Sequence, residues 1–156
     1  MFLEQLKRET ALHKEVVGLG KGRYRVRYEL EGRFTGTHQS VTFVTRQTPI
    51  FRVLTTETGN VVVNGSGKGK MYAKNFEELG IKSQGLVRIV TDAPVIEQNA
   101  QFTRVSITPG FTTYDWRRRD LSDAPPHFVA KFAVDPRTGV PAYGGCGPAD
   151  GPPSAK

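Results

Sequence analysis

The sequence predicts a mainly β protein: an antiparallel sandwich or partly closed barrel of about seven strands, with an N-terminal helix and an extended C-terminal tail. Three observations favour this class. Residues 23–31 alternate apolar and charged side chains, several other segments are rich in β-branched residues, and helical segments do not alternate with strands as a parallel βαβ fold requires. The expected division is a helix and hinge over residues 1–20, a β-rich domain over 21–143 and a Gly/Pro-rich tail over 144–156.

The first element expected along the chain is a helix over residues 2–17. Five residues recur at the helical interval and form its inner stripe: Leu3, Leu6, Thr10, His13 and Val17. Gly18 and Gly20 follow where such a helix would end. Because the apolar stripe is thin, we expect this helix to lie at the edge of the core or to dock on another molecule.

The clearest strand is predicted over residues 23–31. One side of this strand carries Tyr24, Val26, Tyr28 and Leu30. The other side carries Arg23, Arg25, Arg27, Glu29 and Glu31. The alternation indicates one packed face and one solvated, mostly basic face.

Other β-branched or apolar runs predict further strands over residues 40–46, 50–55, 61–64, 70–73, 85–91, 94–97, 101–108, 111–116 and 128–134. Turns are expected at residues 56–60 and at Pro109-Gly110. A short helix is expected to begin at Asn75 and to end at Gly80. Residues 144–156 have a composition that cannot build a core.

The formal net charge of +7 and the pI near 9.8 favour an acidic partner: nucleic acid, an anionic protein surface or a polyanionic assembly. A basic protein that is merely well solvated is the alternative. The longest purely apolar run, residues 61–63, is far too short to cross a bilayer, and the first residues lack the apolar segment of a secretory signal. We therefore expect no membrane insertion, and a location in the cytoplasm or in a particle assembled inside the cell.

The glycine-rich segment 65–70 resembles a phosphate-binding loop only in composition. A Walker loop places Gly-Lys-Ser/Thr at the start of a helix, whereas here Met71 follows Lys70 and a strand is expected next. No βα unit surrounds the segment, so a dinucleotide site is also excluded. A loose anion-binding hairpin and a plain loop both remain open interpretations.

The residues that usually carry catalysis or bind metals are scattered. His13, His38 and His127 lack a second ligand at metal-binding spacing, and a single cysteine, Cys146, excludes an internal disulfide. A dyad of His127 with Cys146 would place the nucleophile in a Gly/Pro-rich segment that cannot hold it near a base. We find no pair of carboxylates suited to acid and base roles, and we expect no catalytic residue, no metal and no cofactor.

Two basic groups and a loop are the candidate partner-binding residues. The first group is Arg23, Arg25 and Arg27; the second is Arg117, Arg118 and Arg119 after Trp116; the loop adds Lys68 and Lys70. Arginine beside Tyr or Trp is typical of protein interfaces and also of nucleic-acid grooves. The nearby acids Glu29, Glu31, Asp115 and Asp120 weaken the nucleic-acid interpretation, and a plain solvated surface is the third possibility.

Two functional hypotheses follow. The first is a non-enzymatic structural or assembly subunit of a larger complex, linker-like or of virion type, oligomeric or part of a hetero-complex with other protein subunits. It would bind these neighbours through its basic faces and its terminal extensions, the N-terminal helix and the C-terminal tail. The second is a nucleic-acid-binding β-barrel domain that contacts phosphates through its arginine and lysine side chains.

Overall fold

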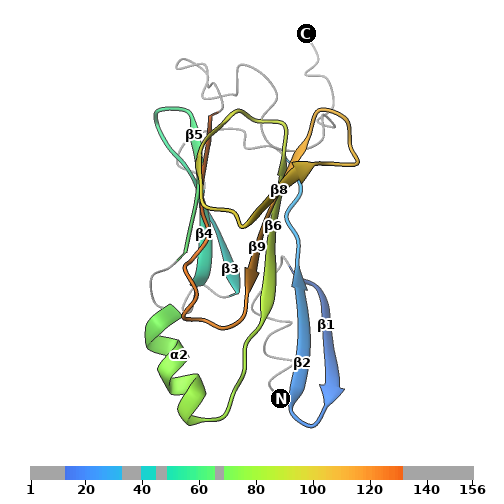
Figure 1. Ribbon diagram of the computed structural model, residues 1–156, viewed down its shortest axis with the longest axis vertical. Coiled ribbons are helices and arrows are strands. Elements are labelled where there is room, and N and C mark those ends of the chain that lie inside the picture. Colours follow the sequence, from blue (N-terminus) through green and yellow to red (C-terminus); the bar gives the residue numbers. More distant parts are fainter. Residues whose placement is uncertain (1–12, 33–39, 45–48, 66–68, 132–156) are drawn as a thin grey trace.

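The computed structural model describes residues 13–32, 40–44, 49–65 and 69–131. Within these ranges the chain forms ten β-strands, which make up three antiparallel sheets, and one α-helix (Figure 1). The predicted mainly β class is confirmed. The described strands form no closed barrel, because each sheet keeps two edge strands. The expected tail over residues 144–156 lies outside the described ranges.

The largest sheet has five strands, which lie in the order β3-β4-β5-β10-β7. Their bounds are β3 (Ser40–Val44), β4 (Pro49–Thr55), β5 (Asn60–Gly65), β10 (His127–Lys131) and β7 (Val95–Gln98). The second sheet has three strands, β6 (Gly85–Thr91), β9 (Thr112–Arg118) and β8 (Phe102–Val105), with β9 in the centre. The third is a hairpin of β1 (His13–Gly20) and β2 (Arg23–Tyr28). The helix α2 (Gly69–Glu78) follows β5 and precedes β6.

The core lies where the five-stranded and three-stranded sheets pack on each other. Phe128 of β10 is 1% exposed, and its ring meets Tyr114 and Trp116 of β9 edge-on, with centroids 5.2 Å and 6.3 Å away. Val63, Ala93 and Ala130 complete the buried cluster. Edge-on contacts between aromatic rings add to the stabilisation that burial alone provides. The two sheets therefore form a sandwich-like body.

A tight turn sets the register of the three-stranded sheet. Pro109 and Gly110 occupy the centre of this turn, Gly110 has φ +82°, and the Phe111 N–H donates to the Thr108 carbonyl at 3.2 Å. Pro at the first central position and a positive φ at the second define a type II turn. The turn predicted at Pro109-Gly110 is confirmed, and it joins β8 to β9.

The predicted helix over residues 2–17 is wrong where the structure describes it. Residues 13–17 belong to β1, which pairs with β2 in the register Val16 to Val26 and Gly18 to Tyr24. Lys21 and Gly22 link the strands with φ angles of +52° and +70°, the signs that a type I′ hairpin turn demands. The hairpin turn and the β-branched Val16-Val17 pair outweigh a thin helical stripe. Residues 1–12 lie outside the described ranges.

The segment after β5 also differs from the prediction. A strand was expected over residues 70–73 and a helix capped by Asn75, but one helix, α2, spans both and places Asn75 in its interior. The predicted end is correct: Gly80 has φ +68°, its N–H donates to the Glu77 carbonyl, and the Ile81 N–H donates to the Phe76 carbonyl. This pair of bonds is a Schellman motif.

Candidate functional site: arginine surfaces of the hairpin and the three-stranded sheet

The first basic group lies on the hairpin. Arg23, Arg25 and Arg27 are all exposed, and Arg27 donates to Glu29 at 2.9 Å. The expected packed side of this strand is only partly covered, since Val26 and Tyr28 are half-buried while Tyr24 is exposed. Burial raises the pKa of the Tyr28 hydroxyl. The strand expected over residues 23–31 ends at Tyr28.

The hairpin stands apart from the core. None of residues 15–28 is buried, and within the described ranges the hairpin's extensive contacts run only between its own two strands. Figure 1 shows it beside β6, on the side away from β9. Its exposed apolar side chains include Val17 and Leu19. A two-stranded ribbon of this kind contributes little to the core and much to the accessible surface.

The members of the second basic group do not all point the same way, because side chains alternate along the strand. β9 runs through Arg118, so Tyr114, Trp116 and Arg118 point to one side and Asp115 and Arg117 point to the other. Trp116 is 3% exposed and its indole N–H donates to Asn99 Oδ1 at 2.7 Å. The expectation that Trp116 lies on the surface beside the arginines is therefore wrong; it is a core residue.

Arg118 holds the loop that follows β9. Its guanidinium donates to the carbonyl oxygens of Leu121 at 3.1 Å, Asp123 at 2.8 Å and Ala124 at 3.4 Å. Its Nε is buried without a hydrogen-bond partner. Next to it, the Arg119 backbone N–H donates to Asp123 Oδ2 at 2.6 Å, while the Arg119 side chain stays exposed. Arg118 thus stabilises the loop, whereas Arg117 and Arg119 remain accessible.

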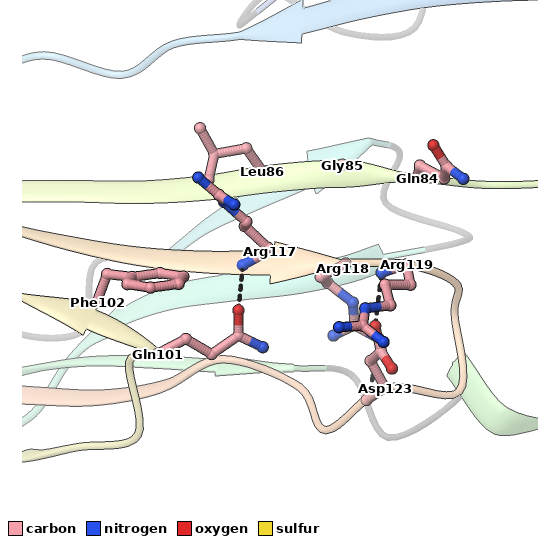
Figure 2. Close-up of a pocket in the computed structure, with 9 residues that line it drawn as sticks. All are labelled: Gln84, Gly85, Leu86, Gln101, Phe102, Arg117, Arg118, Arg119 and Asp123. Carbon is pink, nitrogen blue, oxygen red and sulfur yellow. Dashed lines mark hydrogen bonds between the residues drawn. The ribbon is translucent and has the colours of Figure 1, made fainter.

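A surface depression of about 760 Å³ lies at this end of the three-stranded sheet (Figure 2). Its lining residues come from β6, β8, β9 and the adjoining loops: Gln84, Gly85, Leu86, Gln101, Phe102, Arg117, Arg118, Arg119 and Asp123. The Arg117 guanidinium lies 5.0 Å from the centre of the Phe102 ring, within cation–π range. The depression therefore combines cationic and apolar groups.

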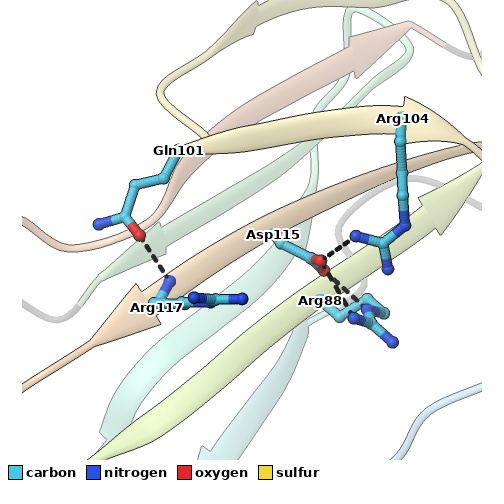
Figure 3. A network of polar contacts seen from close by, with 5 residues as sticks. All are labelled: Arg88, Gln101, Arg104, Asp115 and Arg117. Atoms are coloured by element: carbon cyan, nitrogen blue, oxygen red, sulfur yellow. Dashed lines mark hydrogen bonds and ion pairs between the residues drawn. The ribbon is translucent and has the colours of Figure 1, made fainter.

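The sequence did not reveal the ion-pair cluster in the middle of the same sheet. Arg88 donates from Nε to Asp115 Oδ1 at 2.7 Å and from Nη2 to Oδ2 at 3.0 Å, and Arg104 donates from Nη1 to Oδ2 at 2.7 Å. Figure 3 shows Arg88 of β6 and Arg104 of β8 both bonded to the Asp115 carboxylate. Three charges spread over residues 88–115 become neighbours only when β9 lies between β6 and β8.

The cluster fixes the ionisation of its members. The Asp115 side chain is 6% exposed, and burial alone would raise its pKa. The hydrogen bond from Arg88, assisted by that from Arg104, outweighs burial and lowers the pKa of the Asp115 carboxyl. The same hydrogen bond raises the pKa of Arg88. Asp115 is therefore a carboxylate at neutral pH and holds both arginines in place.

His127 belongs to a separate group on the five-stranded sheet. Its Nδ1 lies 2.8 Å from Asn64 Oδ1 and its Nε2 lies 3.1 Å from Glu97 Oε2, so its ring links β5, β10 and β7. Cys146, its hypothetical partner in a dyad, lies outside the described ranges. Within those ranges, no three His, Cys, Asp or Glu side chains are grouped so that they could hold a metal ion.

Two predicted binding residues are placed differently from the rest. Lys68 lies outside the described ranges, and Lys70 is exposed in the first turn of α2. None of the helices among the described residues has the length and apolar character needed to span a bilayer. No model of a known protein family, no curated protein and no solved structure matches the chain.

Proposed function

We propose that this protein is a non-enzymatic structural or assembly subunit of a larger complex, located in the cytoplasm or in a particle assembled there. It binds neighbouring protein subunits through its exposed basic surfaces. The observation that carries the proposal is the hairpin: it has no buried residue among 15–28, yet it exposes Arg23, Arg25 and Arg27 on the side that also carries Val17. Its other side exposes Tyr24.

The hairpin surface has the composition of a binding surface. Arginine and tyrosine are enriched among the residues that dominate protein interfaces, because both supply contact area together with directional hydrogen bonds. Leu19 is 44% exposed and Tyr24 47% exposed. Apolar area of this kind on a ribbon that adds nothing to the core is best explained by a neighbour that covers it.

The test is recovery of neighbours from the native source through a tagged full-length chain. Reversal of three hairpin charges, Arg23→Glu, Arg25→Glu and Arg27→Glu, is expected to abolish recovery of a defined set of proteins. A matched variant, Arg52→Glu, Lys74→Glu and Lys82→Glu, changes the net charge equally on exposed residues elsewhere and should keep that set. Equal recovery by both variants would contradict a role for the hairpin.

The second candidate function is nucleic-acid binding. The row of three exposed arginines on one strand and the net charge of +7 favour it. Because the described sheets form no barrel, the protein would present the flat arginine row of the hairpin to phosphates. Binding to oligonucleotides that weakens steeply with salt and disappears on reversal of the hairpin charges would support this candidate over the first.

A further inference from the structure

The three-stranded sheet has an outer face, on the side opposite the aromatic core. The strand register places eight side chains on it: Leu86, Arg88 and Val90 from β6, Thr113, Asp115 and Arg117 from β9, and Phe102 and Arg104 from β8. Arg88 and Phe102 flank Asp115 directly, and Leu86 is the direct neighbour of Arg117. This outer face therefore has an acidic centre surrounded by cationic and apolar side chains.

The cationic groups of the outer face are positioned in advance. Asp115 accepts three hydrogen bonds from Arg88 and Arg104, whose side chains are still 46% and 52% exposed. Each guanidinium has five N–H groups, so both arginines keep most of their donors for another acceptor. Groups that are already held in place lose less conformational freedom on binding.

The charges of the outer face do not cancel. Three arginines, Arg88, Arg104 and Arg117, stand against the single carboxylate of Asp115, so the face is positive overall. Leu86, Val90 and Phe102, each 41–53% exposed, lie among these charges. A complementary ligand carries carboxylates at the arginine positions and apolar side chains between them.

We propose that the outer face binds an acidic, partly apolar segment of a partner protein, an inference that rests on the assembly role proposed above. Its carboxylates meet Arg88, Arg104 and Arg117, and its apolar side chains cover Leu86 and Phe102. Nucleic acid fits this face less well, because the Arg117 guanidinium stacks on the Phe102 ring that a base would need.

The test is a titration of the full-length protein with a synthetic peptide that repeats Glu-Glu-Val-Val, followed by NMR at low salt; in an extended peptide this repeat presents Glu and Val on the same side. The Arg88, Arg104 and Arg117 Nε–H signals and the Leu86 methyl signals are expected to shift together. A peptide that repeats Gln-Gln-Val-Val should leave them unchanged. Shifts confined to other surfaces, or tighter binding of an oligothymidylate of equal charge to these arginines, would overturn the proposal.

Two exposed arginines on different sheets supply a matched pair of variants. Arg117→Gln is expected to weaken binding of the acidic peptide about fivefold, because a charge-assisted hydrogen bond is lost. Arg52→Gln removes the same charge from an exposed side chain of β4 and should change the affinity less than about twofold. Equal loss of affinity for the acidic peptide in both variants would show that net charge alone causes the effect, which would contradict the proposal.

The variant Asp115→Asn separates the positioning of Arg88 and Arg104 from the effect of the protein's net charge. The variant is more positive than the wild type, so simple attraction would tighten binding of the acidic peptide. If the carboxylate positions Arg88 and Arg104, the variant instead binds about threefold more weakly, and its arginine Nε–H signals lose their dispersion before peptide is added. Tighter binding would contradict the inference. If the wild type and Arg117→Gln recover the same native neighbours, the assembly role is supported but does not depend on the outer face.

Discussion

At the scale of single residues, Asp115 is the position where the fold accepts a buried charge. An unpaired carboxylate at this depth would be strongly destabilising. Here Arg88 and Arg104 together supply three hydrogen bonds, and both donors reach solvent, so neither cation has lost its hydration completely. The cluster also ties the two edge strands of the three-stranded sheet to its centre.

Asp115→Asn is expected to lower the free energy of unfolding by about 2 kcal/mol at pH 7, because the amide cannot accept all three hydrogen bonds from the arginines. Since the pKa of Asp115 in the folded protein is below its ordinary value of 3.8, the carboxylate stabilises the fold above that pH. Its contribution is lost as the pH falls through the folded pKa. Urea unfolding of both proteins at pH 7 and at acidic pH checks this, and a difference that does not shrink in acid would contradict it.

Substitution of Phe128 and of Phe102 tests which side of the three-stranded sheet faces the core. Phe128→Ala is expected to lower the free energy of unfolding by about 4 kcal/mol, because it leaves a cavity between Tyr114 and Trp116. Phe102→Ala on the half-exposed outer side should lower it by less than about 1 kcal/mol. Similar losses in urea denaturation would refute the assignment of the faces.

The sequence predicted which of these residues lie in strands but not what they contact. Alternation identified the strand that carries Phe128 and Ala130. It did not separate Trp116 from Arg117, because the expected strand stopped at Trp116 whereas β9 continues to Arg118. The longer strand divides the expected surface cluster. Trp116 is a core residue and Arg118 anchors a loop, whereas Arg117 and Arg119 are surface cations.

At the scale of elements, the end of β5 packs closely on the segment before β10. The Gly65 N–H donates to the Pro126 carbonyl at 3.1 Å, and a side chain at Gly65 would collide with the Pro125 Cβ. Pro126 is fully buried. Pro125 and Pro126 therefore pack directly on the end of β5.

Gly65→Ala is expected to lower the free energy of unfolding by about 2 kcal/mol, because the new methyl group forces the backbone of β5 away from Pro125. Gly85→Ala is the matched control: a Cβ there meets nothing within 4 Å, and its change should stay within about 0.5 kcal/mol. Thermal or urea unfolding measures both. Equal stability of the two variants would show that the junction is looser than described.

Most strands could be predicted from the sequence, and the two misassigned segments have a common cause. Residues 85–91 were predicted with both ends correct, because β-branched residues and Gly85 define them. Residues 13–17 and 70–73 are short and weakly patterned, so the segments next to them decide their structure. The hairpin turn at Lys21-Gly22 decides the first, and the continuous helix from Gly69 decides the second.

At the scale of the whole molecule, the strand order could not be predicted because it depends on long-range pairing. β10 lies between β5 and β7, with His127 opposite Asn64 and Val129 opposite Glu97. No local signal in the chain specifies these neighbours. The same pairing leaves the hairpin without a place in either packed sheet.

Amide hydrogen exchange should therefore distinguish the hairpin from the core strands by their rates. The amides of β1 and β2 are expected to exchange about tenfold faster, or more, than those of β5, β9 and β10, because opening the hairpin exposes no buried side chain among residues 15–28. Mass spectrometry of peptides after timed exchange checks this. Protection of the hairpin equal to that of the core strands would mean that it is packed as firmly as the body.

The stoichiometry of the native complex tests the proposed assembly role most directly. Native mass spectrometry of complexes isolated through this chain, after nuclease treatment, is expected to find other protein subunits in a fixed ratio to it. Reversal of the charges of Arg23, Arg25 and Arg27 should release this chain from those complexes. A free protein of 17.2 kDa as the sole species, or an assembly that nuclease dissolves, would contradict the account.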